Sequence, residues 1–199
     1  MSLLDQLSQV VASQVAPQTA RQTGLDQGLA EKMLPMAMSA LMAGIKKNAS
    51  SPEGANALAQ ALDKHDGSLL NDIDKVASPD VLADGQNILA HILGGKRETT
   101  ERALAKAGGI DQAQMSQLMA MAAPMVLGAL GRAKREQGLD ASALAGMVTE
   151  ESVRAQKQAP EGLGGLMGFL DQDGDGDFKD ELMEMAGKQI FGGLFGKRG

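Results

Sequence analysis

The chain has 199 residues, enough for one or two compact domains, and no cysteine, which excludes disulfides, thiolate zinc sites, iron–sulfur clusters and cysteine nucleophiles. Few residues are β-branched or aromatic, whereas the helix formers Ala, Leu, Gln and Met are abundant, so the composition predicts an all-α fold. The formal net charge of −6 argues against a nucleic-acid partner, because phosphate binding needs clustered positive charge.

The N-terminal residues do not resemble a targeting signal. Asp5 lies where a signal peptide carries positive charge, and no sustained apolar segment follows it. The longest uncharged apolar runs, about 13 residues, are shorter than the roughly 20 residues that span a bilayer. We therefore expect a cytoplasmic protein.

Three short sequence blocks occur twice and in the same order, which is typical of an internal repeat. Their repetition predicts that the body of the protein is a multi-helical bundle built from two similar helical units. The blocks at residues 24–27, 35–41 and 55–59 recur at residues 109–112, 124–130 and 141–145.

Each unit is predicted to contain one long, buried helix. The runs at residues 33–45 and 118–130 carry no charge on any face, so both helices should be central. A turn ending at Asp26 or Asp111 precedes each run, and aspartate is a common N-cap residue. Each run contains a proline, Pro35 or Pro124, that should kink or start the helix, because proline removes a backbone hydrogen bond.

Basic residues and methionines near these helices each have two interpretations. The cations after the runs either stabilise helix C-termini, which we favour, or form a phosphate-binding patch. Eight of the 13 methionines lie in or just before the runs and suit core packing, although methionine also lines promiscuous binding grooves. The cations are Lys46, Lys47, Arg132, Lys134 and Arg135.

A third apolar helix is predicted over residues 84–95, where two glycines end it. His91 lies within it beside apolar residues and is predicted to be structural. His65 lies between acidic residues, with no nucleophile pattern nearby, and is predicted to be a surface residue. Two isolated histidines form neither a metal cluster nor a catalytic triad.

Five motifs of the body together resemble a known family. They are Gly24–Asp26, Pro35 with its Met/Ala/Leu helix, Ile88–Gly94, Gly109–Asp111 and Ala123–Met125. In this combination the chain resembles the YidB-like bacterial proteins, a family of unknown function (domain of unknown function 937), over roughly residues 1–150. The resemblance implies a multi-helical fold, and it supplies no catalytic residues and no reaction.

The negative charge is confined to a short segment near the C-terminus. Residues 171–184 contain seven acids and one base, so this segment alone accounts for the net charge of −6. All four phenylalanines also follow residue 168. We therefore expect a duplicated helical domain over residues 1–157, a Gly-rich linker over 158–168 and an acidic tail over 169–199.

The tail contains the sharpest motif of the chain, a truncated calcium-loop signature. Asp171, Asp173 and Asp175 alternate ahead of Gly176 and Asp177, as in the first two-thirds of an EF-hand loop. Alternate carboxylates on a tight turn converge on one point, where they would repel each other without a cation. The spacing therefore favours a hard divalent ion.

The closing position of this loop departs from the EF-hand pattern. Position 12 should be a bidentate glutamate but is Leu182, so Glu181, Asp180 or water would close the site. We predict weak calcium binding, with a Kd of about 10⁻⁴ to 10⁻³ M. The alternative is an Asp/Gly turn before a helix N-terminus. The predicted metal ligands are Asp171, Asp173, Asp175, Asp177 and Glu181.

The favoured function is a non-enzymatic helical module whose calcium loop orders its C-terminal tail. An alternative is a self-associating scaffold, in which the Gly-rich apolar motifs at residues 164–168 and 192–196 dock on another copy or on a protein partner. A membrane surface is a less favoured partner for these motifs, and a helical DNA-binding protein is the weakest alternative. The sequence contains no nucleophile–base pair and no phosphate-cradling loop, so we do not expect an enzyme.

Overall fold

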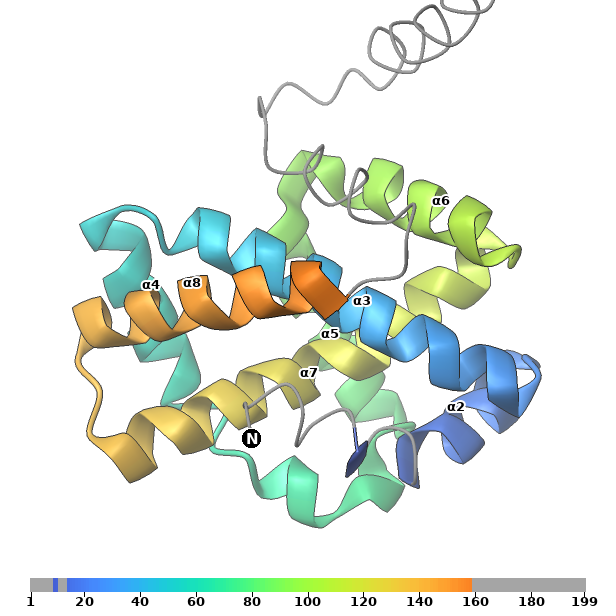
Figure 1. The fold of residues 1–199 in the computed structure, drawn as a ribbon. Coiled ribbons are helices and arrows are strands. Elements are labelled where there is room, and N and C mark those ends of the chain that lie inside the picture. Colours follow the sequence, from blue (N-terminus) through green and yellow to red (C-terminus); the bar gives the residue numbers. More distant parts are fainter. Residues whose placement is uncertain (1–8, 11–13, 159–199) are drawn as a thin grey trace, which may run out of the picture.

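The computed structural model describes residues 9–10 and 14–158, which form helices and their connections without a strand (Figure 1). The predicted all-α fold is therefore confirmed for the described residues. The α-helices are α2 (Ala16–Thr23), α3 (Gln27–Asn48), α4 (Pro52–Leu62), α5 (Pro79–Leu93), α6 (Arg97–Gly108), α7 (Gln112–Gln137) and α8 (Ala141–Gln158), and the short 3-10 helices are η2 (Ser68–Asn71), η3 (Ile73–Lys75) and η4 (Gly94–Lys96).

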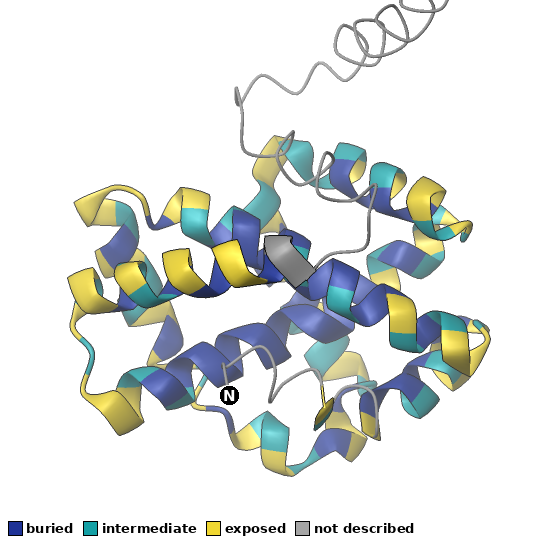
Figure 2. Cartoon of the chain, viewed as in Figure 1, coloured by how far each residue is buried: buried dark blue, intermediate teal, exposed yellow. Residues whose placement is uncertain are grey.

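Helices α3 and α7 form the centre of the fold, as their uncharged runs predicted (Figure 2). Every residue of α7 from Leu118 to Gly131 is buried, and α7 packs against α3 and along α5. The eight methionines in or before the two runs are all buried, which confirms their predicted role in core packing. Such flexible side chains fill the irregular spaces between crossing helices.

Both long helices begin as the sequence predicted. Asp26 accepts a hydrogen bond from a backbone N–H of the first turn of α3, and Asp111 forms a capping box at the start of α7. Gly24 and Gly109 precede these caps with φ of 71° and 66°, a left-handed conformation that glycine adopts without strain. The prolines lie inside α3 and α7 and do not start them. The two units therefore share their turn geometry, while the duplication of the whole unit stays a prediction.

Two glycines let α5 approach both central helices closely. A Cβ atom added to Gly85 of α5 would lie 1.9 Å from the carbonyl oxygen of Ala120 in α7. A Cβ atom on Gly44 of α3 would lie 2.6 Å from Cγ2 of Ile92 in α5. These close crossings fix the position of α5 and thereby direct one of its faces toward α4.

By length and composition alone, α7 is apolar enough to cross a membrane. In this fold, 78% of its most apolar window is buried against the other helices. The central helix of a helical bundle has the same composition, because its whole circumference contacts other apolar side chains.

Candidate binding site between helices α4 and α5

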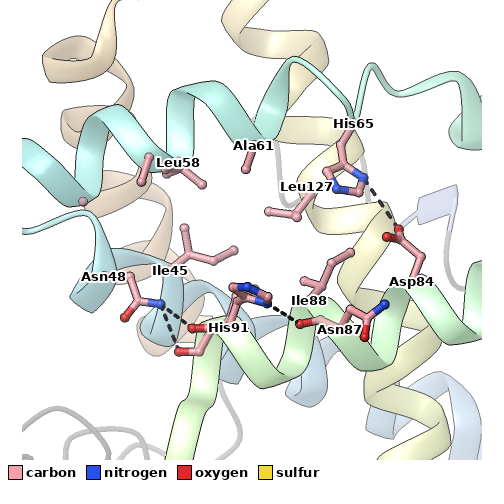
Figure 3. Close-up of a pocket in the computed structure, with 13 residues that line it drawn as sticks. Ile45, Asn48, Leu58, Ala61, His65, Asp84, Asn87, Ile88, His91 and Leu127 are labelled. Carbon is pink, nitrogen blue, oxygen red and sulfur yellow. Dashed lines mark hydrogen bonds and ion pairs between the residues drawn. The ribbon is translucent and has the colours of Figure 1, made fainter.

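A pocket with a volume of about 400 Å³ lies between α4 and α5 (Figure 3). Both helices pack on the central helices, and they make little contact with each other. Small residues of α4, namely Gly54, Ala57 and Ala61, line the gap at helical spacing and leave it open. The volume falls within the range of roughly 300–1,000 Å³ that is typical of small-molecule sites.

The floor of the pocket is apolar. Ile45 of α3 and Leu127 of α7 close its inner end and are 2% and 5% exposed. Leu58 of α4 and two isoleucines of α5, Ile88 and Ile92, complete the apolar lining. The two isoleucines are four residues apart and therefore lie on the same face of α5.

Both histidines of the described chain lie at the polar edge of this pocket (Figure 3). His65 follows α4, and its Nδ1 atom is 3.8 Å from Oδ2 of Asp84 in α5. His91 lies two turns further along α5, where its Nδ1 atom is 2.8 Å from the carbonyl oxygen of Asn87. Asn48 connects α3 to the same region, because its amide nitrogen donates to the carbonyl oxygen of His91 at 3.2 Å.

The sequence did not predict that these two histidines belong to one site. His65 was expected at the surface, but only 19% of its side chain is exposed. The connection after α4 folds back onto α7 and brings His65 beside α5, a contact that local sequence patterns do not encode. Within residues 9–10 and 14–158, no three His, Asp or Glu side chains are placed to share a metal ion.

Basic residues of α7 hold this connection in place. Arg132 donates to the carbonyl oxygen of Gly67 at 2.8 Å, and Lys134 donates to Oδ1 of Asp63 at 2.6 Å. Lys134 also lies in the last turn of α7, as the helix C-terminus interpretation predicted. These cations therefore fasten the segment that carries His65 to the centre of the fold.

A smaller cavity, with a volume of about 190 Å³, adjoins the pocket. Asn48, His91 and Ile92 line both spaces, so the two spaces lie side by side at the C-terminal end of α5. The smaller cavity continues toward Lys47 at the end of α3 and Lys96 before α6. The site therefore has an apolar part and a part with cationic side chains.

The calcium-site prediction falls on another part of the chain. Its five ligands lie outside the described residues, as do the Gly-rich motifs of the tail. The proposed metal ligands therefore still rest on the sequence motif alone. They are Asp171, Asp173, Asp175, Asp177 and Glu181.

Comparison with known proteins gives one family match. The model of the family described as "Bacterial protein of unknown function (DUF937)" matches residues 5–133, a segment that includes every described residue lining the pocket and the cavity. No curated protein and no solved structure matches the chain significantly. Because the matched segment covers more than half of its length, the chain belongs to this bacterial family of unknown function.

Proposed function

We propose that the protein is a non-enzymatic helical module that binds the apolar part of a small ligand between α4 and α5. The observation that carries this proposal is a preformed space of about 400 Å³ with an apolar floor and a few polar groups at its edge. Such an arrangement is typical of ligand sites, because apolar contact supplies affinity and the polar groups orient the ligand.

The lining of the pocket supports recognition. Histidine can donate or accept a hydrogen bond, so His65 and His91 offer two orienting contacts at the edge. The described residues that line this larger pocket include no serine, threonine, tyrosine or lysine. The side chains that meet there are suited to holding a ligand in one orientation.

Filling the pocket tests this function. We expect octanol, a neutral apolar probe, to shift the amide NMR signals of α4 and α5 in the wild-type protein. The Ala57→Leu/Ala61→Leu variant should weaken octanol binding by about tenfold or more, because two larger side chains occupy the space. The matched control is Ala83→Leu/Ala90→Leu, since both alanines are exposed on α5 and outside the lining. Equal octanol affinity in the two double variants, or no octanol binding at all, would contradict the proposal.

We also propose the calcium loop of the tail as a second function, favoured by the alternation of Asp171, Asp173 and Asp175 before Gly176. Calorimetric titration of the full chain with calcium should give a Kd of about 10⁻⁴ to 10⁻³ M. The Asp171→Ala/Asp173→Ala variant should lose this heat, because two of the side-chain ligands are removed. Equal, negligible heats for both proteins would exclude the site.

A further inference from the structure

The smaller cavity beside the pocket has a positively charged lining. Lys47 and Lys96 border it from α3 and from the residue before α6, and His91 borders it from α5. None of the described lining residues is an aspartate or a glutamate. An anionic group placed there would therefore meet positive charge from two different helices.

A buried hydroxyl in this cavity lacks a hydrogen-bond partner. Thr100 of α6 belongs to the lining, has no exposed surface, and its Oγ1 atom makes no hydrogen bond. Folded proteins rarely leave a buried polar atom unsatisfied, because its desolvation is then not compensated. A polar ligand atom that reaches Thr100 would give this hydroxyl the partner it lacks.

The start of α6 borders the same space. Lys96 is the N-cap residue of α6 and Thr100 follows within its first turns, and both belong to the lining. No side chain caps this helix start. The dipole of α6 favours an anion near its N-terminus. Next to it, Gly94 has no atom within 4 Å of a Cβ position, which leaves the backbone open to a ligand.

We propose that the pocket and the cavity together bind one amphipathic anion, a free small molecule with an apolar chain and an oxyanion head such as a carboxylate. The chain would lie in the larger pocket, and the head would meet Lys47, Lys96 and the hydroxyl of Thr100. His91 and Ile92 line both spaces, so one ligand can extend from the apolar part into the cationic part. This inference rests on the proposed function and specifies its ligand class.

Parallel titrations of the full chain with octanoate and with octanol test the inference. Octanoate should bind about tenfold more tightly than octanol, because its head forms charge-assisted hydrogen bonds. The Lys47→Gln/Lys96→Gln variant should lose this difference and keep the octanol affinity of the wild type. The matched control is Lys32→Gln/Lys106→Gln, which removes two exposed lysines outside the cavity and should keep the difference.

The Thr100→Val variant gives an independent readout, because it removes the buried hydroxyl and keeps the shape of the side chain. It should weaken octanoate binding by about threefold or more, and leave octanol binding unchanged. Circular dichroism of each variant should match the wild type, which checks that the fold is retained before the affinities are compared.

The outcomes separate the two proposals. Equal affinity for octanoate and octanol in the wild type would contradict binding of an anionic head group, and it would not affect the proposal of an apolar binding pocket. Binding of neither probe would overturn the proposed function as well. A different result is that the protein sediments with phosphatidylglycerol vesicles and fails to bind monomeric octanoate. That result would contradict a free small-molecule ligand and indicate a lipid of the bilayer. An unchanged octanoate affinity in the Lys47→Gln/Lys96→Gln variant would also contradict the inference.

Discussion

The side chain of Arg97 connects helices α5, α6 and α7. Its Nε atom donates to Oε1 of Glu101 in α6 at 2.8 Å, and its Nη1 atom donates to the carbonyl oxygen of Gln86 in α5 at 3.3 Å. Its Nη2 atom donates to Oγ of Ser116 in α7 at 3.2 Å. Glu101 is only 5% exposed, so Arg97 supplies the charge partner of a buried carboxylate.

Replacing Arg97 should therefore destabilise the fold strongly. We expect Arg97→Met to lower the free energy of unfolding by about 3 kcal/mol, because Glu101 stays buried without its partner. Urea denaturation measures this loss. Arg102→Met is the control, since its ion pair with Glu98 is exposed, and it should cost less than about 1 kcal/mol. Similar decreases in the free energy of unfolding for the two variants would show that the hydrogen bonds of Arg97 contribute little to stability.

Asp66 makes the stability of the folded protein depend on pH in the acidic range. A hydrogen bond from the Ser68 side chain, and then one from the Ser68 backbone N–H at 2.9 Å, hold the pKa of Asp66 below its usual value of 3.8. A carboxyl group whose pKa is lower in the folded state stabilises the protein above its unfolded pKa. That contribution is lost as the pH falls through the lower, folded pKa.

The Asp66→Asn variant should accordingly lose less stability on acidification than the wild type does. Thermal unfolding from neutral to strongly acidic pH checks this expectation, with the decrease in Tm compared between the two proteins. Parallel decreases over the whole pH range would rule out a contribution from Asp66.

At the scale of the helices, α5 crosses α7 closely at Gly85. A side chain at Gly85 would collide with the backbone of α7, whereas Gly146 of α8 has open space around its Cβ position. We expect Gly85→Ala to cost about 2 kcal/mol or more, because the two helices must move apart. Gly146→Ala should raise stability by about 0.5–1 kcal/mol, because alanine is the better helix former. Chemical denaturation of both variants measures the contrast, and a stabilised Gly85→Ala would refute the close crossing.

The helices themselves could be predicted from the sequence, whereas the pocket could not. Asp26 and Asp111 marked the starts of α3 and α7, and the absence of charge on these helices marked their central position. The pocket depends on how far apart α3 and α7 hold α4 and α5, which is a property of tertiary packing. Ala57 and Ala61 leave that gap open, yet in the sequence they are ordinary residues of an Ala-rich helix.

At the scale of the whole molecule, the described helices form one continuous core. Its buried side chains extend from Val15 before α2 to Ala155 in α8 and include members of every α-helix between them. The pocket lies within this core region, because its floor is made by Ile45 of α3 and Leu127 of α7. Ligand binding and folding should therefore be linked, so that a bound ligand stabilises the native state.

This continuous core predicts that a chain ending at Gln158 folds without the tail. We expect this truncated chain to retain the helical circular dichroism spectrum, to unfold in a single cooperative transition and to bind octanol with the affinity of the full chain. Each expectation follows because the described helices already share one continuous core, which also carries the described lining of the pocket. Calorimetry with calcium should in turn give heat only with the full chain, since the proposed ligands from Asp171 to Glu181 are absent from the truncated one. A broad, non-cooperative transition of the truncated chain would show that the tail belongs to the folded domain.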